Sequence, residues 1–299
     1  MSEVEEKKEI LTKKQARIDK AKRMWYRFSR NKMSVVGLVG VILVILIAIF
    51  QDVIAPYPEH AQAYTNYAAV KLAPCKEYLF GTDGTGRDVL SRIIFSFRNA
   101  LAMGIGVIGI AAPIGVVFGL LAGYHKGTWI STVIMRVVDI FLSLPSLVLA
   151  LAVSALLSPT LWHSMMAITF SWWAWYARLV YGSASSVRNE YFVKSAELIG
   201  AKRSHIILKE ILPNCWSTIL TKMTLDMGIV ILMGSTLSFV GLGAQPPAPD
   251  LGTMISDGYK LLPDCWWLTI FPALAIMFIV LAFNLFGDGI SDMLNSKEA

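Results

Sequence analysis

Three glycines at a nucleotide-binding spacing are the first residues in this chain that suggest chemistry. Gly104, Gly106 and Gly109 form a literal GxGxxG, a pattern whose glycines let a backbone approach a pyrophosphate closely. A dinucleotide fingerprint must follow a strand, open a helix and precede an acidic residue by about 20 positions. Here the glycines lie inside an apolar run, and the region beyond them offers Lys126 and no acid. The sequence therefore disfavours a dinucleotide site at this position.

Metal and ATP chemistry also lack a motif in this sequence. No GxxxxGK[ST] loop occurs in the 299 residues, so the chain has no phosphate-binding loop of the ATPase type. The four histidines form no HExxH pair and fall in four different segments, at His60, His125, His163 and His205. We therefore expect no catalytic residue, no metal site and no cofactor bound by this chain.

The three cysteines give no metal or redox motif either. Cys75, Cys215 and Cys265 include no CxxC pair. Cys75 and Cys265 fall in segments predicted to lie outside the cell membrane, where disulfides can form. The residues leave open a disulfide between these two cysteines or two unpaired thiols.

Ionisable side chains in or near the apolar segments bear on whether the chain drives transport by itself. An ion-coupled pump needs such groups deep in the bilayer. All five candidates are predicted to lie toward the cytoplasmic ends of their helices, and Arg136 and Asp139 would pair locally because they are three residues apart. The middle stretches of the second, third, fifth and sixth spans then carry no charge, which disfavours ion coupling. The candidates are Arg136, Asp139, Arg178, Asp226 and Asp288.

The elements that must position these groups are membrane helices. Hydrophobic residues make up 55% of the chain and charged residues only 16%, with a mean hydropathy of +0.57, whereas a soluble domain carries about a quarter charged residues. The apolar residues cluster into runs of membrane length, which means about 20 residues per helix. We therefore predict an all-α polytopic membrane protein with six transmembrane helices.

The net charge of +6 does not indicate nucleic acid, because the cations are concentrated at one place. Eleven of the 27 Lys and Arg residues lie between Lys7 and Lys32, just before the first apolar run. The positive-inside rule predicts this for a cytoplasmic tail. With six spans, both termini and the basic loop 188–216 are then cytoplasmic.

The predicted domain organisation follows the apolar runs. Residues 1–33 form a cytoplasmic tail, in which Met24–Met33 is either a short helix in the lipid headgroup layer or an ordinary charged flank. Asp88–Arg98 is predicted as an amphipathic helix at the outer membrane surface. The remaining divisions are a first span at 34–56, an extracytoplasmic loop at 57–99, a five-helix core at 100–292 and a cytoplasmic tail at 293–299. The core spans are predicted at 100–124, 129–157, 161–187, 219–241 and 266–290.

Small residues and a proline shape two of these spans. Gly115, Gly119 and Gly123 recur every four residues and predict a small-residue face for close helix packing. Pro145 is expected to kink the span at 129–157.

The polar segment Glu190–Asn214 interrupts the apolar runs with the pattern helix, glycine, helix, Leu-Pro. We expect two short helices that meet near Gly200, where a glycine permits close backbone approach, and a second helix that ends at Pro213. This pattern predicts a docking element through which a separate motor protein moves the membrane helices. The second helix would bury an apolar face against a partner or the membrane-side helices, formed by Ile206, Ile207, Ile211 and Leu212.

This segment resembles the EAA motif of the inner-membrane permeases of binding-protein-dependent ABC importers, which reads Glu-Ala-Ala, three residues, Gly, then a helix ending in Leu-Pro. Lys194 stands where the family usually has Glu, and Ser195 stands where it usually has Ala. The resemblance implies that the motif positions contact an ATPase subunit, at Lys194, Ser195, Ala196, Gly200, Ala201, Leu212 and Pro213.

Further segments between Met24 and Asp292 resemble the second, C-type subunit of the peptide and nickel branch. They are WYRFSRNKMSVVGL, FGTDGTGRDVLSR, DIFLSLPSLVLAL, WWAWYARLV, LSFVGLGAQPPAPDLGTMI and FPALAIMFIVLAFNLFGDGISD. The resemblance implies a type I ABC importer permease fold in the inner membrane of a prokaryote. It also implies a second six-helix permease subunit, two cytoplasmic ATP-binding subunits that carry ATP and Mg, and an extracytoplasmic substrate-binding protein.

The resulting hypothesis is a permease subunit that forms half of a translocation pathway for peptides by alternating access. Nickel or metal chelates, glutathione-like peptides and opines remain alternative substrates. An ion-coupled secondary transporter and a membrane-embedded enzyme are the rivals from other classes, and the sequence offers neither mid-span carboxylates nor a nucleophile–base pair for them. Trp172, Trp173 and Trp175 could line the pathway, or could pack against lipid and neighbouring helices.

Overall fold

The structure, a computed structural model, describes residues 15, 18–19 and 22–294. Within these residues the fold is all-helical, and β-type pairing is limited to an isolated bridge between Thr82 and Asp88. The predicted all-α class is therefore confirmed. The segment 22–30 is helical. The expectations for residues 1–14 and 295–299 lie outside the described residues.

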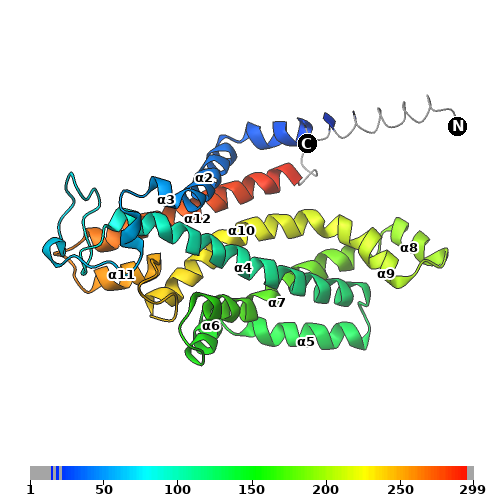
Figure 1. The fold of residues 1–299 in the computed structure, drawn as a ribbon. Coiled ribbons are helices and arrows are strands. Elements are labelled where there is room, and N and C mark those ends of the chain that lie inside the picture. The colour runs from blue at the N-terminus through cyan, green and yellow to red at the C-terminus, as the bar shows by residue number, and fades with distance from the viewer. Residues whose placement is uncertain (1–14, 16–17, 20–21, 295–299) are drawn as a thin grey trace.

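Four helices of the described chain are long and apolar enough to cross a membrane. A fifth candidate is a bent pair, α5 (Trp129–Ser143) and α6 (Ser146–Ala155). The helix α7 (Leu161–Val187) has 27 residues, but Trp, Tyr and Ser side chains make it less apolar than these. It packs against α4, α5, α6 and α10 in the middle of the bundle (Figure 1). The four apolar helices are α2 (Lys32–Ile49), α4 (Val89–Tyr124), the continuous helix Arg203–Phe239 that ends in α10 (Leu212–Phe239), and α12 (Trp267–Leu294).

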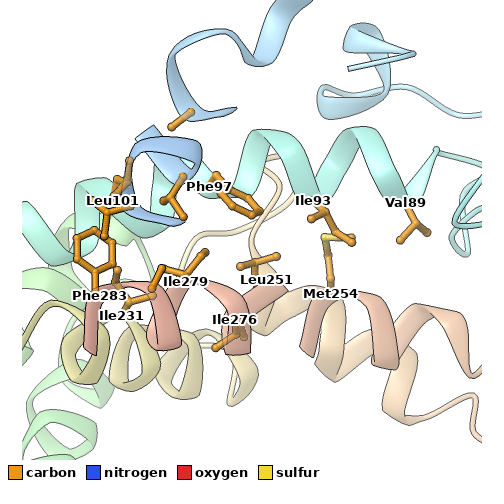
Figure 2. Packing of buried hydrophobic residues seen from close by; sticks show 14 of the residues in the cluster. Val89, Ile93, Phe97, Leu101, Ile231, Leu251, Met254, Ile276, Ile279 and Phe283 are labelled. Atoms are coloured by element: carbon orange, nitrogen blue, oxygen red, sulfur yellow. The ribbon is translucent and has the colours of Figure 1, made fainter. Parts of the chain in front are cut away.

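The helix α4 corrects the predicted division between a surface helix and a second span. It begins after Asp88, whose carboxylate accepts a hydrogen bond from the Ser91 amide at 2.8 Å, and it continues for 36 residues. Its first half carries a buried stripe at four-residue spacing, Val89, Ile93, Phe97 and Leu101. Figure 2 shows this stripe facing residues of α10, α11 (Leu251–Tyr259) and α12. Because the stripe is buried along its whole length, Asp88–Arg98 belongs to the bundle and not to the membrane surface.

The predicted small-residue face of α4 is confirmed, and it packs against α7. A Cβ atom added at Gly119 would lie 2.7 Å from the Ala177 carbonyl oxygen, and one added at Gly123 would lie 2.6 Å from the Ala184 Cβ. Gly115 is equally close to the α7 backbone. The GxGxxG at 104–109 lies wholly within α4, so it follows no strand and opens no helix.

The expected kink at Pro145 is a complete break. The axes of α5 and α6 differ by 84°. Leu144 has an extended backbone with φ −96° and ψ 137°, as expected for a residue that precedes proline. The proline therefore ends one helix and starts another, where the sequence predicted one bent span.

The bundle has two distinct ends (Figure 1). One end holds α11 and the loop after α3 (Gln51–Ile54), with its short helices η1 (Pro58–Ala61) and η2 (Tyr67–Ala69). The other end holds α8 and α9, described below. The start of α2 and the end of α12 lie toward that second end and are joined there, since the Asn31 side-chain amide donates to an Asp292 carboxylate oxygen at 3.2 Å.

Candidate functional site

The segment with the helix–glycine–helix pattern forms a compact projection at one end of the bundle (Figure 1). It consists of α8 (Tyr191–Leu198), a turn, α9 (Arg203–His205) and the π-helical segment η3 (Ile206–Ile211). The predicted order of elements is confirmed. We call the whole segment 188–216 the docking loop.

A glycine is needed in the turn of the docking loop because of its backbone conformation. Gly200 has φ +78°, in the left-handed region. The Gly200 amide donates to the Glu197 carbonyl and the Ala201 amide donates to the Ala196 carbonyl, both at 3.1 Å. These two bonds close α8 with a left-handed glycine cap. The expectation of a close backbone approach is not met within this chain, since nothing lies within 4 Å of a Cβ added at Gly200.

The second helix of the docking loop does not end at Pro213, contrary to the sequence prediction. The helix continues without interruption from Arg203 to Phe239. Just before the proline it is π-helical, and the Leu212 amide donates to the Ile207 carbonyl five residues earlier. The wider π turn shifts the hydrogen-bond ladder, so that it accommodates a residue without an amide hydrogen. The docking loop is therefore rigidly joined to α10.

The residues of the EAA-like motif differ in burial: one is buried, and the others are exposed or half-buried. Ala196 is buried in a cluster with Val193 of α8 and with residues of η3, α4 and α7. Lys194, Ser195, Gly200 and Pro213 are exposed, and Ala201 and Leu212 are half-buried. The expected apolar face of the second helix is confirmed, and it packs on the membrane-side helices. Its buried members are Ile206, Ile207 and Ile211.

Exposed apolar side chains on the docking loop were missed from the sequence. Tyr191, Leu198 and Ile199 are 87%, 88% and 84% exposed. Beside them is an open hollow lined by Ala201, Lys202, Ser204, His205, Leu208 and Lys209. Their spacing could have predicted this exposure, because on a helix Leu198 and Ile199 do not fall on the face that Val193 and Ala196 define. Such a patch is typical of a surface that another protein covers.

The three tryptophans of α7 differ in their contacts and in their exposure. Trp173 packs against Phe118 of α4 and Phe141 of α5, with ring centroids 5.5 Å and 5.2 Å away. Trp172 is buried, and its indole NH donates to an Asp226 carboxylate oxygen at 2.9 Å. Trp175 is 42% exposed and donates to the Ser146 hydroxyl at 3.1 Å.

An ion pair in α10 gives Asp226 a partner that the sequence analysis did not consider. The Lys222 ammonium lies 2.7 Å from Asp226, and it lies 5.9 Å and 6.0 Å from the ring centroids of Trp172 and Trp175. Trp172 is the twelfth of the 27 residues of α7, so the pair lies against the middle of that helix. Lys222 was missed although its four-residue spacing to Asp226 is that of a helical ion pair.

The expected local pair of Arg136 with Asp139 is also wrong. Asp139 of α5 forms its ion pair with Arg178 of α7, whereas Arg136 is exposed. The contact joins two helices, because Asp139 lies on the side of α5 that faces α7.

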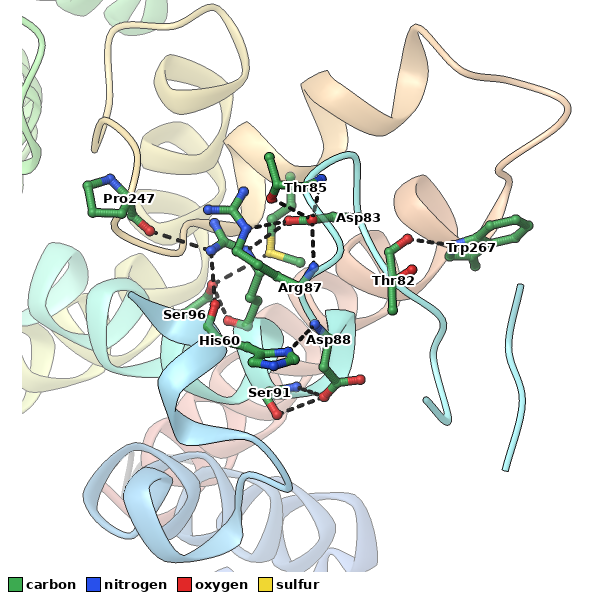
Figure 3. Close-up of polar contacts among 12 residues, drawn as sticks. His60, Thr82, Asp83, Thr85, Arg87, Asp88, Ser91, Ser96, Pro247 and Trp267 are labelled. Atoms are coloured by element: carbon green, nitrogen blue, oxygen red, sulfur yellow. Dashed lines mark hydrogen bonds and ion pairs between the residues drawn. The ribbon is translucent and has the colours of Figure 1, made fainter. Parts of the chain in front are cut away.

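The loop at the opposite end is an ordered cap (Figure 3). An Asp83 carboxylate oxygen accepts from the Arg87 Nε at 2.7 Å, and the buried Arg92 lies 3.6 Å from it. Arg92 also donates to the carbonyls of His60 at 3.3 Å and Pro247 at 3.4 Å. Burial alone would raise the pKa of Asp83, but the Arg87 amide and guanidinium and the Thr85 hydrogen bonds lower it below its ordinary value. These contacts tie the loop 57–88 to the loop before α11.

His60 completes this cap as a neutral side chain. Its Nδ1 accepts a hydrogen bond from the Asp88 amide at 2.8 Å, and its ring stacks on Tyr57 and Tyr64. Burial lowers the pKa of His60 below its ordinary value, although Glu59 and Asp88 act in the opposite direction. The acceptor role requires the unprotonated ring nitrogen.

The cysteine alternatives are resolved in favour of unpaired thiols. Cys75 is exposed, Cys215 and Cys265 are buried, and all three are free. Over the described part of the chain, no group of three or more His, Cys, Asp or Glu side chains is arranged to hold a metal ion.

Two family models match most of this chain. Residues 115–298 match the model of the family described as binding-protein-dependent transport system inner membrane component. Residues 21–74 match the model described as N-terminal TM domain of oligopeptide transport permease C.

Three relatives cover nearly the whole chain. A probable D,D-dipeptide transport system permease protein of Escherichia coli K12 is 38% identical over 98% of this chain and 97% of its own length. A dipeptide transport system permease protein of Alkalihalophilus pseudofirmus is 38% identical over 91% of this chain and 88% of its own. A glutathione transport system permease protein of Escherichia coli O157:H7 is 39% identical over 91% of this chain and 89% of its own. With its family model matched from Gly115 onward and relatives above 30% identity over almost its full length, the chain belongs to the binding-protein-dependent transport system inner membrane components.

Proposed function

We propose that this chain is a transmembrane permease subunit of an ATP-driven importer of dipeptides or oligopeptides, and that it forms half of the translocation pathway by alternating access. Family membership and the names of the relatives support the transport of peptides. One structural observation supports the mechanism best: the second helical part of the docking loop, from Arg203 onward, is continuous with α10. A displacement of the loop by a partner would therefore move a helix of the bundle.

The proposed topology has six spans, formed by α2, α4, the broken pair α5–α6, α7, α10 and α12. Both termini and the docking loop are cytoplasmic, and the loop 57–88 is extracytoplasmic. The core begins with α4 at Val89 and ends with α12 at Leu294, and α2 precedes it. Two observations support this arrangement: the docking loop lies at the same end as the start of α2 and the end of α12, and the outer loop lies at the other (Figure 1).

A labelling experiment tests this topology. The exposed Cys75 should react with a membrane-impermeant maleimide in intact cells. In a Cys75→Ser background, Ser204→Cys in the docking loop should react only after the membrane is permeabilised. Labelling of Ser204→Cys in intact cells would place the docking loop outside and remove the proposed coupling.

The proposed partners are a second six-helix permease subunit, two cytoplasmic ATP-binding subunits and an extracytoplasmic substrate-binding protein, in the inner membrane of a prokaryote. ATP and Mg bind on the partner subunits, so hydrolysis is not performed by this chain. The proposed contacts with an ATP-binding subunit are Lys194, Ser195, Ala196, Gly200, Ala201, Leu212 and Pro213. Ala196 acts from inside the loop, because it is buried.

Alternating access requires that ATP and substrate bind the two states of the bundle with different affinity. In this mechanism, ATP binding closes the motor dimer and moves the docking loop, and the helices reopen toward the binding protein. Trp172 and Trp175 are proposed to lie on the pathway through their contacts with Lys222. Trp173 packs between α4 and α5, so its role is in packing.

Reconstitution tests the proposed function against an ion-coupled transporter. The assembled complex in proteoliposomes should take up a dipeptide only when ATP is inside the cytoplasmic compartment and the binding protein is outside. An ion gradient without ATP should drive no uptake. Uptake by this chain alone, driven by an ion gradient, would contradict the proposal.

A further inference from the structure

The Lys222–Asp226 pair has an unusual position for two charges in a membrane helix. Asp226 is completely buried, and both of its carboxylate oxygens are engaged, one by Lys222 at 2.7 Å and the other by Trp172 at 2.9 Å. The Lys222 side chain is 28% exposed and lies over the rings of Trp172 and Trp175. Each oxygen of the carboxylate therefore has a partner, whereas the ammonium keeps an accessible side.

The accessible side of Lys222 has a half-buried polar neighbour on the same side of α10. This neighbour is Thr218, four residues earlier in the helix. Charged groups in membrane helices face the bundle interior or a water-filled cavity. The partly exposed Lys222 ammonium is therefore directed at an aqueous pathway or at another protein chain.

The direction of the Lys222 side chain separates it from an ordinary interfacial lysine. Side chains on a helix lean toward its N-terminus, and a lysine near the start of a span extends toward the headgroups. Lys222 instead reaches forward to Asp226, one turn further into α10. Its ammonium thereby lies against the middle of α7, where a charge is costly unless it has a function.

The free hydrogens of Lys222 define the ligand that would fit. An ammonium has three donors, and in the described chain one of them binds Asp226. The remaining donors suit a carboxylate, because charge-assisted bonds of this kind are the stronger ones. Trp175, which is 42% exposed, supplies an apolar ring beside that position.

Resting on the proposed function, we propose that Lys222 is a substrate-binding residue of the translocation pathway and contacts a carboxylate of the peptide in transit. Asp226 is its positioning residue, which holds the ammonium beside the two indole rings. Because Asp226 already balances the charge of Lys222, an arriving carboxylate shares the ammonium and does not neutralise a bare cation. Binding is then moderate, as a site that must also release its substrate requires.

Variants of the reconstituted complex test this assignment, with Ala-Ala and Ala-Glu as the transported peptides. Each peptide is supplied at a concentration that saturates the isolated binding protein. Lys222→Gln should lower the ATP-driven uptake rate about tenfold or more, as expected for the loss of a charge-assisted hydrogen bond. Lys222→Arg keeps a cation and should retain most of the uptake. Lys260→Gln, an exposed lysine on the outer end, is the matched control.

The double variant Lys222→Met with Asp226→Leu separates binding from structure. Replacing both partners of a buried ion pair with apolar residues is often neutral for folding. The double variant should therefore assemble with its partner subunits and still lose uptake about tenfold or more. This variant also carries the test if the single Lys222→Gln protein fails to assemble because Asp226 is left unpaired.

The outcomes distinguish the sources of the carboxylate and the rival explanations. An equal loss for both peptides assigns the C-terminal carboxylate, and a larger loss for Ala-Glu assigns a side-chain carboxylate.

Normal uptake by the double variant would overturn the proposal and make the pair structural. Loss of the second permease subunit from complexes of the double variant would overturn it in favour of a subunit contact. A wild-type complex that imports neither peptide would remove the proposed function, and this assignment with it.

Discussion

The amide of Ala201 donates a hydrogen bond to the carbonyl of Ala196 at 3.1 Å, across a turn in which Gly200 has φ +78°. This bond lets α8 reverse onto the helix that continues into α10. The geometry requires a residue that tolerates the left-handed region, and it leaves open space around the Gly200 Cα within this chain. The turn therefore requires a residue that adopts left-handed backbone angles, whereas the space around it within this chain would admit a side chain.

Two substitutions at Gly200 separate these requirements. Gly200→Asn should assemble and import nearly normally, because Asn tolerates left-handed backbone angles. Gly200→Val should lose uptake, since a β-branched residue at this φ is strained by about 1–2 kcal/mol. The measurements are ATP-driven uptake and the amount of ATP-binding subunit that co-purifies. If the Asn variant loses that subunit while its own thermal unfolding is unchanged, the partner must approach the glycine backbone closely.

The exposed side chain of Leu198 is predicted to bind an ATP-binding subunit. Leu198→Ser should reduce the co-purified ATP-binding subunit several-fold, since an apolar side chain at a protein interface contributes about 1–3 kcal/mol when buried. Leu156→Ser is a matched control, because Leu156 is 87% exposed, against 88% for Leu198, and follows α6 outside the docking loop. Equal recovery of the subunit from both variants would show that Leu198 is not in the interface.

The glycines of α4 predict a position-dependent effect on stability. Gly115→Ala places a methyl group against the backbone of α7, whereas Gly109→Ala places one where no atom lies within 4 Å. The first change should destabilise the protein by about 1–3 kcal/mol through overpacking. The second should be neutral or slightly stabilising, since alanine favours a helix more than glycine does. Thermal unfolding in detergent compares the two, and equal midpoints would contradict the close α4–α7 contact.

The cap around His60 predicts a dependence of stability on pH. The folded-state pKa of His60 lies below its ordinary value of 6.5, so the unfolded chain binds a proton first as the pH falls. The contribution of His60 is therefore fully present above about pH 6.5 and is lost progressively as the pH falls toward the lowered folded pKa. Asp83 does not titrate in this range, because its pKa is held below 3.8.

A single substitution isolates this effect. Asn at position 60 can accept the Asp88 amide hydrogen bond through its side-chain oxygen, but it has no proton to gain. Between pH 7.5 and pH 5.5, the unfolding midpoint of the wild type should fall by a few degrees, and that of His60→Asn should fall less. The difference between the two proteins corresponds to a change in stability of about 1 kcal/mol, the contribution of one hydrogen bond. An identical fall in both proteins would assign the pH dependence to other groups.

The local features of this protein were predictable from the sequence. The apolar runs, the helix–glycine–helix order of the docking loop and the packing face at Gly115, Gly119 and Gly123 all appear in the structure. These features depend on hydrophobicity and on backbone preferences within a few residues, which a single sequence displays directly. The resemblance of the docking loop to the EAA motif likewise depends on residues close together in the chain, and the family model that matches residues 115–298 agrees with the family it indicated.

The contacts between helices were decided by the tertiary structure. Asp139 pairs with Arg178 of another helix, and Asp226 holds Lys222 and Trp172 together. Pro213 does not end its helix, because a π turn and the packing of Ile206, Ile207 and Ile211 hold the chain helical across it. A charge takes its partner from whichever helix lies beside it, and a helix continues through an unfavourable residue when packing outweighs the local preference. Both outcomes depend on residues far apart in the chain, so they became visible only once the helices were assembled.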